Sequence, residues 1–173
     1  MVELSTLTKQ HVTALFGSSD RAEAERLLAS ECAENLPLVN NPTPPGLERL
    51  RFAAIRLSGG SLLRLCDAIR LAKTDWRDLL VASDFAHDVR AHERWQPRRL
   101  EPAMVDSWMA GDLPAGVKFG QNAPVKIRFG GACQGARGVV ISLVGLEPEP
   151  RFLIELASGE SVEELQCVLE HAG

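Results

Sequence analysis

Residues 130–156 read GGACQGARGVVISLVGLEPEPRFLIEL, and they set the interpretation of the C-terminal third of the chain. Four glycines fall within the first nine residues of this stretch, and glycine adopts the positive φ angles of tight turns without steric cost. An almost wholly apolar run follows at 139–144, which predicts a strand buried on both faces. After a Pro-Glu-Pro turn, apolar residues recur at 152, 154 and 156, the period of two that is typical of a strand.

The flanking residues extend the same pattern in both directions. Before the glycines, Val125, Ile127 and Phe129 alternate with Lys126 and Arg128, which predicts another strand. After residue 156, a Ser-Gly turn precedes a short strand at 162–166, and residues 168–169 form a last strand or one helical turn. Four or five short strands in about fifty residues indicate a small antiparallel β-barrel.

The first 96 residues instead show the helical period. Leu62, Leu65, Cys66 and Ile69 are spaced at i, i+3, i+4 and i+7, which predicts a helix with one buried face. A later helix is expected to bury residues 85, 89 and 92. Four residues or pairs predict helix starts: Thr8, Asp20 with Glu23 three residues later, Thr43 before Pro44, and Thr74. The two glycines at 59–60 predict a helix end.

A segment rich in proline and glycine separates these two patterns. It is expected to contain one short helix with Val105, Trp108 and Met109 on one side. The predicted fold class is therefore α+β: a compact helical domain at 1–96, a connector at 97–123, and a small β-barrel at 124–173.

Composition limits the classes of function. The 173 residues carry a net charge of −4, with 45% hydrophobic and 24% charged residues, which are ordinary values for a soluble globular domain. The four cysteines show no C-x-x-C spacing, the N-terminus does not resemble a secretory signal, and no apolar run is long enough to span a bilayer. These features predict a cytoplasmic protein without a membrane partner.

Two stretches resemble known proteins. Gly135-Ala136-Arg137-Gly138, followed by the valine-rich run, resembles the KOW motif. That resemblance covers Val125 to Leu169 and implies a small Src-homology-type (SH3-like) barrel of the kind found in ribosomal proteins and transcription elongation factors. In the helical part, AKTDWRDLLVASDF at 72–85 resembles uncharacterised bacterial proteins, and this resemblance implies no activity.

The glycine loop supplies the candidate contact with a partner. We expect Arg137, Gly135, Gly138, Lys126 and Arg128 to form it, although the same glycines would also serve a structural turn. Glu147 and Glu149 follow in the next turn and oppose a phosphate ligand, so another protein is favoured over RNA. A second candidate contact is the locally basic stretch 47–73, whose structural alternative is a solvated helix face.

Motifs for catalysis are missing from the sequence. The single cysteine of the glycine loop, Cys133, has no base predicted beside it, and neither G-x-S-x-G nor a P-loop occurs. Asp84, Asp88 and His92 could share a helix face, but a fourth metal ligand is missing. We therefore expect no catalytic residue, no metal and no cofactor.

These observations favour a non-catalytic protein-binding or adaptor module of a bacterial cytoplasm. The first alternative is a factor associated with RNA, the ribosome or transcription, which would act through the KOW-like barrel and show a basic face and salt-dependent binding. The second alternative is a small enzyme without a recognisable motif. The partner and the oligomeric state are not indicated by the sequence.

Overall fold

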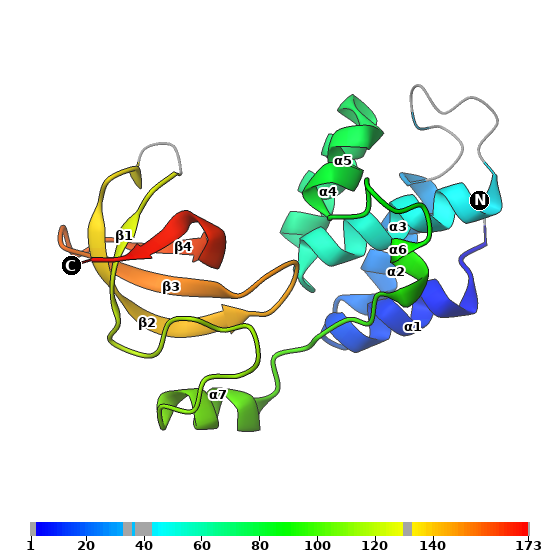
Figure 1. Ribbon diagram of the computed structural model, residues 1–173. Helices are drawn as coiled ribbons and strands as arrows, with labels where there is room; N and C mark the ends of the chain where they lie inside the picture. The colour runs from blue at the N-terminus through cyan, green and yellow to red at the C-terminus, as the bar shows by residue number, and fades with distance from the viewer. Residues whose placement is uncertain (1–2, 33–35, 37–42, 130–132, 173) are drawn as a thin grey trace. The chain divides into compact units, whose positions relative to one another are not determined.

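Helices and strands occupy separate parts of the chain, as the change of period predicts (Figure 1). The computed structural model describes residues 3–32, 36, 43–129 and 133–172. The chain divides into two compact units, Met1–Arg98 and Arg99–Gly173, and each has its own hydrophobic core. We call them the helical unit and the sheet unit.

The helical unit contains six of the described helices. Phe52 and Leu65 are completely buried in its core, and helices of this unit present apolar faces to one another around them. The helices are α1 (Thr6–Leu15), α2 (Arg21–Ser30), α3 (Pro44–Ser58), α4 (Leu62–Thr74), α5 (Trp76–Ala82) and α6 (Ala91–Arg94).

Capping side chains fix where these helices begin and end. The predictions at α3 are confirmed: Thr43 Oγ1 accepts a hydrogen bond from Gly46 N at 3.3 Å, and Gly59 ends the helix with a φ of 53°. The predicted cap of α1 is wrong, because Ser5 Oγ caps the helix by accepting from Thr8 N at 3.0 Å. The cap of α5 is Asp75, one residue after the prediction, and Asp20 makes no capping hydrogen bond through its side chain.

The predicted helix face through residues 85, 89 and 92 is wrong. Asp84 has a φ of 59°, a left-handed conformation that a helix cannot continue through. Phe85 and His92 are buried, but Val89 between them is 68% exposed. Turns therefore occupy most of this segment, and only α6 is helical.

The sheet unit begins with one helix and continues with five antiparallel strands (Figure 1). The strands run in the order β4-β3-β2-β1-β5. Their bounds, with the helix α7 and the 3-10 turn η2, are α7 (Pro102–Met109), β1 (Pro124–Ile127), β2 (Arg137–Gly145), β3 (Arg151–Leu156), β4 (Ser161–Leu165), η2 (Gln166–Val168) and β5 (Leu169–His171).

The sheet is open, which corrects the prediction of a closed barrel. β4 and β5 are its two edges and do not pair with each other. The turn η2 separates these strands, and β5 has only three residues, all of them paired with β1. Closure of a barrel needs hydrogen bonds between the first and last strands, and these short edges do not make them.

One face of the sheet carries the core of this unit. Val140, Leu143, Phe152 and Ile154 are buried on that face. Register shifts lie between Val140 and Ser142 and again before Gly145, and such bulges change the direction of the following side chains. Residues 139–144 are therefore not buried on both faces as predicted, because the side chains at 139 and 144 are 37% and 36% exposed.

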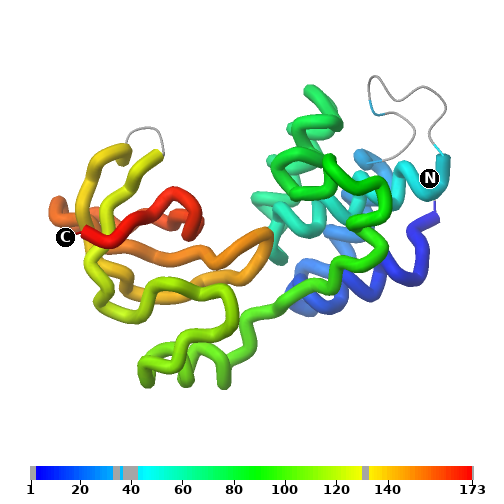
Figure 2. The backbone as a smooth tube through the Cα atoms, in the orientation of Figure 1, coloured from blue at the N-terminus to red at the C-terminus, as the bar shows by residue number. Residues whose placement is uncertain are grey.

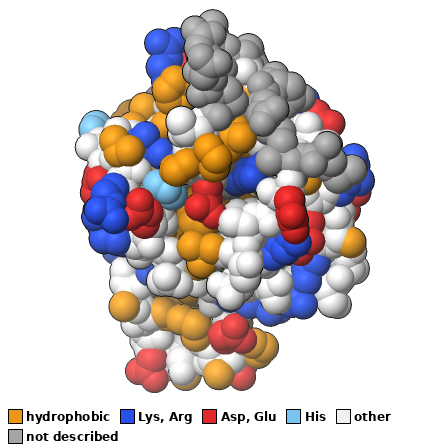
Figure 3. Space-filling model, turned by 90° about the vertical axis from the view of Figure 1, so that its right-hand side faces the viewer, with side chains coloured by type: hydrophobic (Ala, Val, Ile, Leu, Met, Phe, Trp, Pro, Cys, Tyr) orange, Lys and Arg blue, Asp and Glu red, His pale blue; other side chains and the backbone are white. Residues whose placement is uncertain are grey.

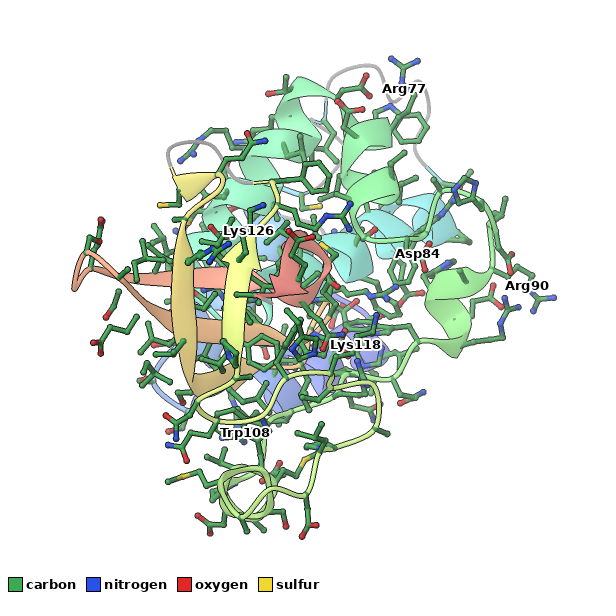
Figure 4. All side chains as sticks on the ribbon, turned by 60° about the vertical axis from the view of Figure 1, so that its left-hand side comes forward. Arg77, Asp84, Arg90, Trp108, Lys118 and Lys126 are labelled. Atoms are coloured by element: carbon green, nitrogen blue, oxygen red, sulfur yellow. The ribbon has the colours of Figure 1, made fainter. Side chains whose placement is uncertain are left out.

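Residues 99–123 pack into the sheet unit, and Figure 2 traces their course from α7 to β1. Trp108 is buried between α7 and the strands, and its Nε1 donates to Phe119 O at 2.9 Å (Figure 4). Gln166 accepts from Lys118 N at 2.6 Å and donates to Gly116 O at 2.9 Å. The expected apolar side of α7 is only partly buried, since Met109 is 55% exposed.

Candidate functional site

The cations of the predicted contact have different surroundings. Lys126 of β1 and Arg137 of β2 are direct cross-strand partners, and like charges in that position repel. Glu170 of β5 compensates one side of this pair, because its carboxylate lies 3.5 Å from Lys126 Nζ and 3.6 Å from Arg128 Nε. Arg128 also lies over the ring of Phe129, with 5.2 Å from its Cζ to the ring centroid. Two of the three predicted cations are therefore already engaged.

Arg137 is the remaining cation. Its side chain is exposed and makes neither a hydrogen bond nor an ion pair with any residue that the structure describes. It lines an open depression of about 430 Å³ between β2 and the β3–β4 hairpin. The other lining residues are Gly138, Val139, Glu155, Leu156, Ala157 and Gly159.

The two glycines of the predicted contact have different roles. Gly135 has a φ of 84° and open space where a Cβ would lie, so it serves the turn before β2. At Gly138, a Cβ would lie 2.4 Å from Glu155 O and 2.8 Å from Ile154 Cγ2. Gly138 therefore permits close approach of β2 and β3, and it forms part of the floor of the depression. The structure brings Arg137 and Gly138 together at this depression and places Gly135, Lys126 and Arg128 outside its lining.

The depression combines both charges with an apolar surface. Glu155 is exposed and is the cross-strand partner of Val139, while Leu156 and Ala157 contribute apolar contacts. Glu155 is not among the contact residues that the sequence predicts. Alignment of the 152–156 alternation with the 139–144 run would have placed Glu155 beside Val139, but the register depends on the bulges in β2.

The two glutamates of the following turn do not both face solvent. Glu147 is only 3% exposed, and its backbone oxygen accepts a hydrogen bond from Arg151 Nη2 at 2.8 Å. Glu149 lies beside the thiol of Cys167. The repulsion of phosphate at this turn stays a prediction, and Glu149 is the more exposed of its two carboxylates.

The basic stretch at 47–73 is largely satisfied inside the helical unit. Arg51 is buried and donates from Nε to Cys32 O at 3.1 Å, and burial lowers its pKa. The remaining contacts are Arg49 with Phe85 O, Arg56 with Ser83 O, Arg70 with Asp67 and Lys73 with Glu31. Figure 3 shows Lys and Arg interspersed with Asp and Glu on the face in view. These contacts favour the structural alternative for the basic stretch.

An aromatic cluster lies in the core of the helical unit. The ring of His11 is 4.5 Å from that of Phe52 and 5.0 Å from that of Trp95 (centroid to centroid). The polar atoms His11 Nε2, His92 Nδ1 and Trp95 Nε1 are buried and have no hydrogen-bond partner among the described residues. Burial lowers the pKa of His11, and the charge of Glu48 opposes this shift in part. Both histidines are thus core residues.

Two of the four thiols, those of Cys32 and Cys167, are poorly suited to nucleophilic chemistry. Burial raises the pKa of Cys32 to about 12. The pKa of Cys167 is raised to about 11 by burial first and then by Glu149. A reactive cysteine requires the opposite shift.

The proposed metal ligands are not arranged as a site. Within the described part of the chain, no group of three or more His, Cys, Asp or Glu side chains could hold a metal ion. Asp88 instead pairs with Arg94, and a backbone hydrogen bond from Arg90 followed by that contact lowers its pKa. Likewise, none of the described helices combines the length and apolar character needed to cross a membrane.

Comparisons with known protein families, curated proteins and solved structures found no match to this chain. The functional interpretation therefore depends on the geometry of the depression and its charges.

Proposed function

We propose that the protein is a non-catalytic binding or adaptor module that contacts another protein through the depression at Arg137. This proposal depends on a difference in ion pairing among the three cations. Glu170 compensates Lys126 and Arg128, whereas Arg137 makes no ion pair with a described residue. An arginine in an exposed apolar setting is a favoured interface residue, because its planar group both stacks and donates several hydrogen bonds.

The mixed charge of the depression supports a protein partner over a nucleic acid. A phosphate backbone requires several cations that face the same surface. Glu155 lies within the depression, and residues 117–173 contain five Lys or Arg against seven Glu, a net charge of −2. A protein surface with a carboxylate and apolar side chains fits this arrangement better.

The KOW-like and SH3-like identity of the sheet unit is part of the proposal. It is supported by five antiparallel strands, a 3-10 turn before the last strand, and a glycine at position 138 that lets β2 approach β3. The proposal also includes the bacterial cytoplasmic setting that the sequence favours. An RNA-associated role through the same sheet is the outcome that would replace it.

The experiment compares Arg137→Ala with Arg128→Ala as a matched control. The intact chain is used as bait in a bacterial lysate, and a partner identified by mass spectrometry is then purified and titrated by fluorescence anisotropy. Loss of a central arginine contact costs about 1–3 kcal/mol, so we expect weaker binding by Arg137→Ala and little change with Arg128→Ala. Equal losses in both variants would contradict the proposal.

A structured RNA is titrated in parallel at several salt concentrations. Micromolar or tighter binding that weakens steeply with salt would indicate the RNA-associated role. We expect no such binding, because Glu170 compensates Lys126 and Arg128, and Arg137 is the one cation among the residues that line the depression.

A further inference from the structure

The helix α7 turns one side to the core of the sheet unit and leaves the opposite side exposed. Met104 and Trp108 are four residues apart and share the inner side, where Trp108 is buried (Figure 4) and Met104 packs partly against the core. Ala103, Asp106 and Ala110 follow the outer side, and all three are exposed. Because the two alanines are small, a second helix can approach this side closely.

The C-terminal end of α7 adds two exposed apolar side chains to the outer side. Gly111 has a φ of 98°, and Asp112 N donates to Ser107 O at 2.9 Å. This bond belongs to the Schellman motif, which turns the chain back at the end of a helix. Leu113 follows directly and is 46% exposed, and Met109 in the last turn is 55% exposed. Apolar surface is thus held in a fixed place at the end of α7.

The charges on this segment are all negative. Residues 100–117 contain three acidic residues, Glu101, Asp106 and Asp112, and no basic residue. None of these carboxylates forms an ion pair with a residue that the structure describes, including Arg99 and Lys118 on either side in the sequence. Asp106 lies in the last turn of α7 and Asp112 just beyond it, where the helix dipole favours a cation. This placement is unfavourable within the chain alone, and a cation from a partner would relieve it.

We propose that the outer side of α7 binds a short, basic, amphipathic helix of another protein. We call this surface the α7 face, and it consists of six exposed residues: Ala103, Asp106, Met109, Ala110, Asp112 and Leu113. Apolar side chains of the partner helix contact Met109 and Leu113, and Lys or Arg at the border of its apolar side approach the two aspartates.

The charge of the α7 face decides among its occupants. A second copy of this chain is a poor occupant, because two α7 faces would bring like charges together. An anionic membrane surface is disfavoured for the same reason. None of the six residues lines the depression at Arg137, so this proposal and the proposed function can fail independently.

The probe is a blocked, helix-forming peptide with Leu on one side, Arg along the border of that side and Ala elsewhere. It is titrated into the isotopically labelled full chain, and backbone amide shifts are followed by NMR. We expect the shifts to centre on residues 103–113, to weaken with salt, and to persist in Arg137→Ala. A peptide of the same composition and charge in scrambled order lacks the apolar side, so it should bind about tenfold more weakly.

Matched substitutions test the two components of the α7 face. Asp106→Asn combined with Asp112→Asn should weaken binding about tenfold, whereas Glu160→Gln removes an exposed charge elsewhere in the sheet unit and should leave binding unchanged. Met109→Gln should weaken binding about fivefold through lost apolar contact. Leu63→Gln, at an exposed position of α4, is its control and should have no effect.

Thermal unfolding of the double variant distinguishes a binding role from a structural role. The two carboxylates oppose the helix dipole, so the free chain with Asp106→Asn and Asp112→Asn should be at least as stable as the native chain. A lower unfolding temperature of this variant would overturn the proposal. So would equal binding of the scrambled peptide, shifts centred elsewhere, no binding, dimerisation of the free chain through α7, or binding of α7 to vesicles of anionic phospholipid.

Discussion

The helical unit and the sheet unit treat their buried polar groups differently. In the helical unit, ring nitrogens of His11, His92 and Trp95 lie in the core without a hydrogen-bond partner among the described residues. In the sheet unit, Trp108 donates to Phe119 O and Gln166 bridges two backbone groups. An unsatisfied buried polar group costs roughly 1–3 kcal/mol. The helical core is therefore sensitive to protonation of His11, whereas the sheet core is sensitive to the loss of the hydrogen bonds that satisfy its polar groups.

The largest effect is expected from Trp108→Ala. This change leaves a cavity between α7 and the strands and removes a buried hydrogen bond, so it should cost about 3–5 kcal/mol of sheet-unit stability. Hydrogen exchange, measured peptide by peptide during unfolding in urea, reports the stability of each unit separately. Equal loss of protection in α3 and α4 would show that the units unfold together, contrary to the expectation from their separate cores.

The next largest loss of stability is expected at Gly138, and it should exceed the loss at Gly135. Gly138→Ala should cost about 1–3 kcal/mol, because its Cβ would meet Glu155 O at 2.4 Å and β2 would have to move away from β3. Gly135→Ala meets no neighbouring atom and suffers only the strain of a φ of 84°, about 1 kcal/mol. Thermal unfolding of both variants checks the order, and a larger loss for Gly135→Ala would contradict it.

A smaller difference in stability is expected between substitutions at two tryptophans. Trp108→Phe leaves Phe119 O without its donor, whereas Trp95→Phe removes an indole N–H that has no partner among the described residues. We therefore expect Trp108→Phe to cost about 1 kcal/mol more than Trp95→Phe. Chemical denaturation of the two variants measures the difference, and equal costs would mean that an ordered water satisfies Trp95.

The smallest effect expected is a loss of helical-unit stability when His11 takes up a proton. Burial holds the pKa of folded His11 below its usual value, so the unfolded chain takes up the proton first as the pH falls. Stability of the helical unit is therefore full above a pH of about 6.5 and declines below it, before the carboxylates titrate. Urea midpoints at several pH values test this. His11→Gln should flatten the decline, and an unchanged slope would assign it to other groups.

Local patterns predicted much of this fold. The alternation at Val125 and Ile127 and the cap at Thr43 with Pro44 depend on neighbouring residues alone, and both were confirmed. The open sheet was not predicted, because closure depends on whether the two edge strands meet. The exposure of Val139 was missed for a similar reason, since bulges in β2 set its direction.

The candidate site was predicted in part. Arg137 was found because it is the one cation in the glycine loop, and its role as a contact remains a prediction. Glu155 was missed, because it joins the depression only through the pairing of β3 with β2. The engagement of Lys126 and Arg128 was also missed, since Glu170 is distant in sequence and reaches them across the β1–β5 pair.

The bridge formed by Gln166 has a consequence for synthesis of the chain on the ribosome. Its side chain holds Gly116 and Lys118, about fifty residues earlier in the sequence. Domains generally fold as units, the N-terminal one first, as the chain emerges. The helical unit can complete its core once residue 95 has left the exit tunnel, but residues 116–118 must wait for residue 166. The nascent sheet unit therefore cannot close this bridge until residue 166 has emerged, and during that interval the apolar side chains of its core form a surface that a chaperone would recognise.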